Sequence, residues 1–199
     1  MFEKQFKLDI RAEEKLKKEV KMLRLKRAVL LFMAPLITVS LLLAQDTASQ
    51  SVTMRVSEIC VIDVTGNPST LVILPPANGG DVPANPSDSS TYAQYTSVVA
   101  SGKTRSITAQ WAAGDSAPSG CELQLQAQPA GGNHGTSAGT ITLSPTPQNI
   151  VTGIGSCATG RGPSNGARLT YTLVITDVES LVAGEEKTVT VTLTLTDDA

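Results

Sequence analysis

The sequence predicts an all-β protein, an antiparallel β-sandwich preceded by a helical signal segment. Three observations predict this class. Apolar and polar residues alternate in several short segments after residue 45, turn-forming residues separate these segments, and an apolar run follows a basic stretch near the N-terminus. Alternation with a period of two is typical of strands with one buried face. Many short strands with turn signals between them favour an antiparallel sandwich.

The signal segment begins with the basic residues Arg24, Lys26 and Arg27, continues with the apolar residues 28–43, and ends at the small residue Ala44. This order is typical of a secretory signal peptide, and an apolar run of about 16 residues is shorter than a membrane-spanning helix. We therefore predict a charged leader and signal peptide over residues 1–44. The alternative is an uncleaved anchor, because Leu42 is larger than usual at the −3 position.

The charged residues 1–21 allow two interpretations. Translation from Met22 would give a signal peptide of ordinary length, whereas a start at Met1 would add a cytoplasmic amphipathic helix. In either case residues 45–199 are expected to form a single secreted domain, large enough for a core of its own.

The predicted mature chain is acidic. Residues 45–199 contain six Lys and Arg against thirteen Asp and Glu, a formal charge of −7. This charge gives no footprint for nucleic acid and no basic patch for an anionic membrane. We expect contact with a membrane only through the signal segment before cleavage, and a location outside the cell or at its surface.

The alternating segments predict the strands in chain order. They lie near residues 52–64, 70–74, 95–99, 104–111, 121–128, 138–144, 148–152, 167–176 and 187–196. In the last segment Val189, Val191, Leu193 and Leu195 alternate with threonines, whose branched side chains suit the outer face of a sheet. The longest predicted loop, residues 75–92, contains four prolines and cannot form a central strand.

Three cysteines predict one disulfide in an exported protein. Cys121 and Cys157 both lie at predicted strand edges next to turns, so we expect these two to pair. Such a bridge would close a loop of about 37 residues and stabilise the fold by about 4 kcal/mol. Cys60 lies in the apolar run 59–62 and is expected to be a small buried side chain.

The residues that usually carry catalysis are few. His134 is the single histidine of the chain and lies in a glycine-rich stretch, so the sequence predicts neither a catalytic triad nor a metal site. Carboxylates such as Asp63, Asp115, Glu122 and Asp177 are scattered over strand edges and polar faces. We therefore expect no enzyme, no catalytic residue, no cofactor and no bound metal.

Several stretches resemble a group of uncharacterised secreted β-sandwich proteins from Bacteroidota-type bacteria. They are residues 90–97, 103–108, 149–173 and 189–198, which together extend over most of the mature chain. In size and strand pattern the chain is also loosely similar to bacterial fimbrial, or pilin-like, subunits, and this similarity implies a sandwich of the immunoglobulin-like or pilin-like kind. The first resemblance implies secretion without any established activity, and the second implies a structural role at the cell surface.

The predicted function is that of an exported structural or adhesive surface protein, with a pilin-like subunit as its most specific form. Val52, Met54 and Val56 alternate with polar residues directly after the predicted cleavage point, so this segment is a candidate for strand exchange. Its partner would be a second copy or another surface subunit, although pairing within its own sheet is the simpler alternative. From another functional class, the alternative is a secreted carbohydrate-binding module or a polysaccharide hydrolase.

Overall fold

The computed structural model describes residues 14, 15, 17–24 and 47–198, and the chain divides into the units Met1–Met54 and Arg55–Ala199. In the first unit the described residues between 14 and 24 are helical, whereas residues 47–54 form neither helix nor strand. Most of the predicted signal peptide and its cleavage point lie outside the described residues. Within the described ranges, no helix is both long and apolar enough to cross a membrane.

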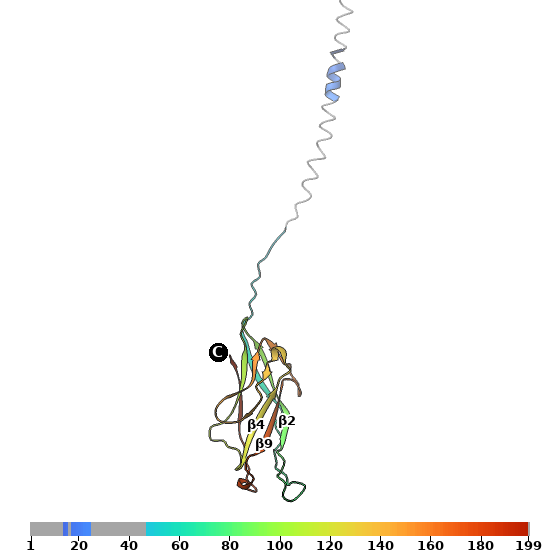
Figure 1. Ribbon diagram of the computed structural model, residues 1–199. Helices are drawn as coiled ribbons and strands as arrows, with labels where there is room; N and C mark the ends of the chain where they lie inside the picture. Colours follow the sequence, from blue (N-terminus) through green and yellow to red (C-terminus); the bar gives the residue numbers. More distant parts are fainter. Residues whose placement is uncertain (1–13, 16, 25–46, 199) are drawn as a thin grey trace, which may run out of the picture. The chain divides into compact units, whose positions relative to one another are not determined.

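The second unit is built from two antiparallel sheets, which confirms the all-β prediction (Figure 1). The six-stranded sheet has the order β1, β2, β9, β4, β6, with β8 also paired to β2; the four-stranded sheet has the order β10, β3, β7, β5. The bounds of the first sheet are Ile59–Thr65 (β1), Ser87–Val98 (β2), Ala167–Ile175 (β9), Cys121–Gln128 (β4), Thr140–Thr142 (β6) and Cys157–Ala158 (β8). Those of the second are Val191–Asp197 (β10), Arg105–Trp111 (β3), Gln148–Ile154 (β7) and Thr136–Ser137 (β5). Two short 3₁₀ turns, η1 (Gly132–His134) and η2 (Val178–Ser180), lie in the connections.

Residues from both sheets contribute to one apolar core. Its fully buried large side chains include Leu125 and Leu169 of the six-stranded sheet and Ile107 and Ile150 of the four-stranded sheet. The predicted alternation is visible in β10, where Leu195 is buried, Leu193 is half-buried and the intervening threonines are exposed. This burial follows from strand geometry, because successive side chains point to opposite faces.

A buried arginine joins strands of both sheets at one end of the unit. Arg105 is only 3% exposed, and its Nε donates a hydrogen bond of 2.6 Å to the carboxylate of Asp197. Its Nη1 donates to the carbonyls of Ile59 and Val98. A planar guanidinium can serve several acceptors at once, which suits this position. The start of β1 and the end of β10 therefore lie together, so these two strands run in opposite directions.

The strand bounds differ from the prediction at several places. β1 begins at Ile59 instead of residue 52, β10 begins at Val191 instead of 187, and residues 70–74 belong to no strand. Conversely, β2 extends back to Ser87, into the predicted loop, with an irregularity between Asp88 and Thr91 where its register against β9 shifts. A strand needs a hydrogen-bonded neighbour, and the alternation of a segment does not show whether that neighbour exists.

Candidate functional site

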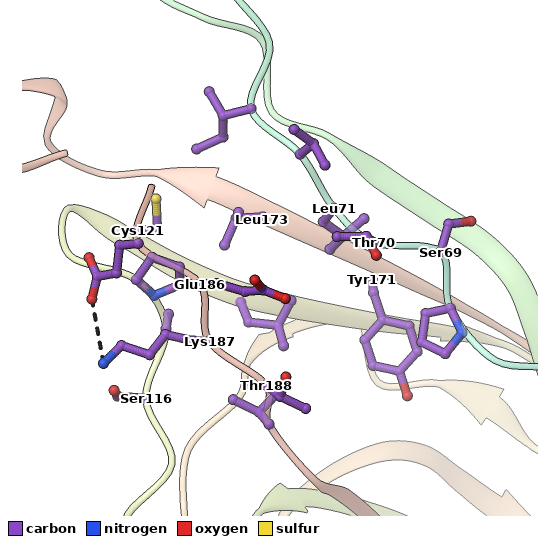
Figure 2. A pocket seen from close by; sticks show the side chains of 18 of the residues that line it. Ser69, Thr70, Leu71, Ser116, Cys121, Tyr171, Leu173, Glu186, Lys187 and Thr188 are labelled. Carbon is purple, nitrogen blue, oxygen red and sulfur yellow. Dashed lines mark ion pairs between the residues drawn. The ribbon is translucent and has the colours of Figure 1, made fainter. Parts of the chain in front are cut away.

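A groove of about 1050 Å³ opens between the sheets, at the end of the unit opposite Arg105. Its floor consists of inward-facing side chains of the six-stranded sheet, among them Thr91, Leu123, Tyr171 and Leu173. One wall is the segment 66–73, which follows β1, and the other is the segment 181–191, which leads into β10. Figure 2 shows Leu71 on the first wall, Leu173 and Tyr171 between the walls, and Glu186 to Thr188 on the second wall.

Both walls are extended segments that alternate like strands. On the first wall Leu71 and Ile73 are half-buried, whereas Val72 and Leu74 are 54% and 67% exposed. On the second wall Val189 is half-buried between two exposed threonines. The side-chain pattern of a strand is therefore present in both walls, as the sequence predicted for 70–74 and 187–196.

The walls lack the hydrogen bonds that would make them strands. In the described part of the chain, residues 69–74 and 186–189 form no hydrogen bond with another backbone group and belong to no strand. Unpaired N–H and C=O groups in a row are the template to which another strand adds. Because β1 and β10 run in opposite directions, the two walls that continue them do so as well.

The floor of the groove holds one polar group that lacks a partner. Thr91 is 1% exposed, and its hydroxyl oxygen forms no hydrogen bond with any described residue. Leaving a buried hydroxyl unpaired costs about 1–3 kcal/mol. The neighbouring Tyr171 is 8% exposed, and burial raises the pKa of its phenol to about 12. The phenol is therefore neutral at physiological pH, and the floor carries no charge from it.

Cys121 lies at one end of the groove with a free thiol. Burial, and in second place the nearby Glu185 carboxylate, raises the pKa of this thiol. The carboxylate itself has a lowered pKa, mainly because it accepts a hydrogen bond from the backbone N–H of Ser119. Cys121 is thus a neutral, protonated thiol at pH 7, and its side chain adds to the apolar lining.

The predicted disulfide between Cys121 and Cys157 is wrong in this structure, where all three cysteines are free. Cys121 begins β4, where it pairs with the last residue of β9. Cys157 pairs with Ser97 of β2, four residues beyond Ala93, the partner of the first residue of β9. The two cysteines are thus separated by the length of the sheet, roughly 30 Å or more at 3.3 Å per residue. A disulfide needs Cα atoms within about 7 Å.

The prediction for Cys60 is also corrected. This residue is exposed on β1, the edge strand of its sheet, and its thiol donates a hydrogen bond of 3.5 Å to the carbonyl of Leu195. An edge strand has sheet on one side only, so even its inward-facing side chains remain open to solvent. The apolar run around Cys60 did not distinguish an edge strand from a central one.

Each of the four carboxylates accepts a hydrogen bond from another group of the protein. Asp115 accepts a hydrogen bond from the backbone of Thr190, and Asp177 accepts one from the backbone of Glu179 in η2. Asp63 accepts one from the backbone of Val64, and Glu122 accepts one from the side chain of Gln124. The described residues contain no group of three or more His, Cys, Asp or Glu side chains placed to hold a metal ion.

The single histidine lies in the short turn η1. The ring nitrogen Nδ1 of His134 is 3.1 Å from the carbonyl of Gly131, and Nε2 is 3.5 Å from that of Ala158. The backbone carbonyl of His134 accepts a hydrogen bond of 2.5 Å from the hydroxyl of Tyr95, which is buried. Both ring nitrogens therefore face backbone carbonyls, as expected of a residue that stabilises a turn.

The predicted strand-exchange segment is extended and exposed. Val52, Met54 and Val56 are 71%, 87% and 83% exposed, and residues 47–58 belong to no strand. Pairing within its own sheet, the simpler of the two expectations for this segment, is not observed among the described residues.

Comparisons with known proteins do not identify a relative of this chain. The chain matches no protein-family model, and it has no significant match among curated proteins or solved structures.

Proposed function

We propose that this chain is an exported structural or adhesive protein of the cell surface, a pilin-like subunit that joins its neighbours by strand pairing. The observation that carries the proposal is the exposed segment before β1, in which Val52, Met54 and Val56 alternate with polar residues. Scattered exposed apolar residues are ordinary on a protein surface. An ordered series on one side of an extended segment is instead typical of a strand that pairs with a sheet edge.

The proposed architecture of the subunit is a β-sandwich. Two observations support it: the sheets are purely antiparallel, and side chains of both contribute to one buried cluster. Antiparallel sheets with one apolar face each are stable when these faces pack together. Residues 24–44 support export, because basic residues, an apolar run and a small residue follow one another in the order of a signal peptide.

The proposed role is non-enzymatic, and the partner is a second copy or another surface subunit. Support comes from the carboxylates themselves, because Asp115, Glu122 and Asp177 each accept a hydrogen bond from a backbone N–H or an amide side chain of the protein. A glycoside hydrolase needs two carboxyl groups about 5–10 Å apart that are available to a sugar, whereas these carboxylates already bond to groups of the protein.

The experiment is sedimentation velocity of the mature chain, residues 45–199, over a range of concentrations. We expect oligomers from the native chain and monomers from the triple variant Val52→Thr, Met54→Ser and Val56→Thr. The matched control, Ser51→Thr with Thr53→Ser, changes the other side of the same segment and should assemble like the native chain. A native chain that stays monomeric throughout, and that binds a polysaccharide on a glycan array, would replace this proposal by the carbohydrate-binding alternative.

Export is tested separately. N-terminal sequencing of the protein recovered outside the cytoplasm should begin at or near Gln45, and labelled antibodies should mark the surface of intact cells in electron micrographs. A membrane-bound species that still carries Met22 would instead identify residues 24–44 as an anchor.

A further inference from the structure

The groove between the two walls has the properties of an acceptor for a strand. We propose that it binds residues 48–56 of a second copy of this chain, which insert between residues 69–74 and residues 186–189. This inference rests on the proposed function and adds to it the place where the strand binds. The exposed edges of the two sheets are the other surfaces at which a strand could add, and the test below distinguishes them from the groove.

The backbone of the two walls favours the insertion of a strand. Neither wall has a backbone partner in its central residues, within the part of the chain that the structure describes. An inserted strand would offer N–H and C=O groups to both walls at once, whereas a strand at the edge of a sheet pairs on one side only. Since the walls run in opposite directions, the inserted strand would be antiparallel to one wall and parallel to the other.

The side chains of the segment match those of the groove. In an extended segment Ala48, Gln50, Val52, Met54 and Val56 point to the same side. The groove presents apolar side chains along the same direction, with Leu71 and Ile73 on one wall, Leu173 on the floor and Val189 on the other wall. Methionine adapts readily to an irregular apolar surface, which suits the central position of Met54.

The charges of the segment and of the groove rim also favour binding. Residues 48–56 carry one charged side chain, Arg55, which points away from the apolar side of the segment. The charged lining residues of the groove are Glu185, Glu186 and Lys187, so the rim has an excess of one negative charge. Lys187 already lies 3.5 Å from Glu185 in an ion pair, drawn in Figure 2. An inserted segment with a single outward-facing arginine is complementary to this rim.

The reach of the chain prevents Met54 and Val56 from entering the groove of their own copy. The walls lie beyond Thr65, the last residue of β1. Thr65 is about 20 Å from Ile59, the first residue of β1, at 3.3 Å per residue. Val56 lies three residues before Ile59 and Met54 five residues before it, so they extend at most about 11 Å and 18 Å from that point. Neither can pass the end of β1 within the same chain. A strand that places the whole of residues 48–56 in the groove must therefore come from another copy.

Disulfide trapping with the native Cys121 tests the proposal, because this thiol lines the groove. The background is the mature chain with Cys60→Ser and Cys157→Ser. Single substitutions Gln50→Cys, Val52→Cys, Met54→Cys and Val56→Cys probe the apolar side of the segment, and Ser51→Cys, Thr53→Cys and Arg55→Cys are the matched controls from its other side. After oxidation with diamide, intermolecular disulfides are measured on non-reducing gels and mapped by mass spectrometry.

We expect at least one apolar-side cysteine to form a disulfide with Cys121 of another copy in about tenfold higher yield than any control, because alternate side chains enter the acceptor. Replacing Cys121 by serine should abolish this product. Equal yields from both sides of the segment, or oligomers without any link to Cys121, would overturn the assignment of the groove.

A second measurement separates this inference from the proposed function. Leu71→Arg places a charge in the groove, and Leu74→Arg places the same charge on the exposed side of the same wall. Thermal unfolding first establishes whether both variants are folded. If Leu71→Arg does not fold, the disulfide trapping at Cys121 is the deciding test of the groove. We expect Leu71→Arg to remain monomeric and Leu74→Arg to assemble. Assembly of both folded variants would refute the groove and leave strand pairing in place, whereas a native chain that never assembles would refute both.

Discussion

At the scale of single residues, Arg105 is the charged side chain that the described fold buries. Its ion pair and hydrogen bonds extend to Asp197, Glu58 and the carbonyls of two strands. The hydrogen bond with Asp197 is the main reason that its pKa is raised. Burying a charge costs free energy unless its donors have acceptors. The contribution of Arg105 to stability therefore depends on all of its acceptors together.

We therefore predict that Arg105→Lys lowers the free energy of unfolding by about 2–3 kcal/mol, because an ammonium cannot serve acceptors in the plane of a guanidinium. The measurement is urea unfolding of the mature chain followed by circular dichroism. Arg168→Lys is the control, since Arg168 is exposed and bonds to the side chain of Gln128. A similar change for both variants would contradict the role given to Arg105.

Thr91 leads to a prediction of the opposite sign. Its hydroxyl is buried without a partner in the described fold, so Thr91→Val should raise the free energy of unfolding of the monomer by about 1 kcal/mol. Ser97→Ala is the contrasting variant, because the hydroxyl of Ser97 accepts a hydrogen bond of 3.4 Å from Arg105. Its removal should lower the free energy of unfolding by about 1 kcal/mol. Destabilisation by Thr91→Val would show that the hydroxyl has a partner in solution.

Asp88 makes stability depend on pH. Hydrogen bonds from the Ser69 hydroxyl, and then from Ser90, lower the pKa of this carboxyl from 3.8 to about 2. A lowered pKa in the folded state means that the stabilisation is complete above about pH 4 and is lost as the pH falls towards 2. Because the Asp88 carboxylate lies near solvent, we expect its hydrogen bonds to contribute about 1 kcal/mol to the free energy of unfolding.

The test compares the native chain with Asp88→Asn in urea at several pH values. The difference in unfolding free energy between the two should shrink between pH 4 and pH 2 and remain constant between pH 5 and pH 8. A difference that does not change over the acidic range would show that Asp88 has an ordinary pKa.

At the scale of elements, the strand β9 depends on the glycine before it. Gly166 has φ of +108°, and a Cβ at this position would collide with the backbone carbonyl of Ala93 in β2. We expect Gly166→Ala to destabilise the fold by about 2–4 kcal/mol, because both the strain and the overlap fall on the β2–β9 pairing. Gly102 has φ of +76° and open space around it, so Gly102→Ala should cost about 1 kcal/mol. Equal losses, measured by thermal unfolding, would contradict this account.

The elements also show which parts of the fold were predictable. The strands β3, β4 and β9 agree with the predicted segments because alternation, length and flanking turns all point to the same result. The segments 52–58, 70–74 and 187–190 have the same alternation, yet they are not strands here. Alternation reports which side chains suit a pleated surface, whereas a strand also needs a neighbour, and that neighbour is not encoded in the segment itself.

The candidate site illustrates the same limit. Sequence reasoning identified Val52, Met54 and Val56, and it assigned strand character to both segments that became groove walls, but it did not indicate that a gap separates them. The predicted disulfide between Cys121 and Cys157 was wrong for a related reason. Being next to a turn does not determine at which end of a sheet a residue lies, and the pairing of β4 with β9 sets Cys121 and Cys157 at opposite ends.

At the scale of the whole molecule, the open groove links folding to association. The monomer leaves an apolar groove and two rows of backbone groups in water, and a bound strand covers both. Any molecule that binds the folded state alone raises its apparent stability, by about 2.7 kcal/mol at a concentration 100 times the dissociation constant. In the proposed assembly this molecule is the chain itself, so its stability should depend on its own concentration.

The expected result is a thermal unfolding midpoint of the mature chain that rises by roughly 5–10 °C over a 100-fold increase in protein concentration above the dissociation constant, since each kcal/mol shifts a domain of this size by about 2–4 °C. The triple variant Val52→Thr, Met54→Ser and Val56→Thr should lack this dependence and unfold at the midpoint of the dilute native chain, because these exposed side chains stabilise nothing within the subunit. Differential scanning calorimetry at several concentrations measures both midpoints. A midpoint of the native chain that does not change with concentration would mean that the exposed segment and the groove do not meet between copies, and a lower midpoint of the triple variant at every dilution would mean that the segment belongs to its own subunit.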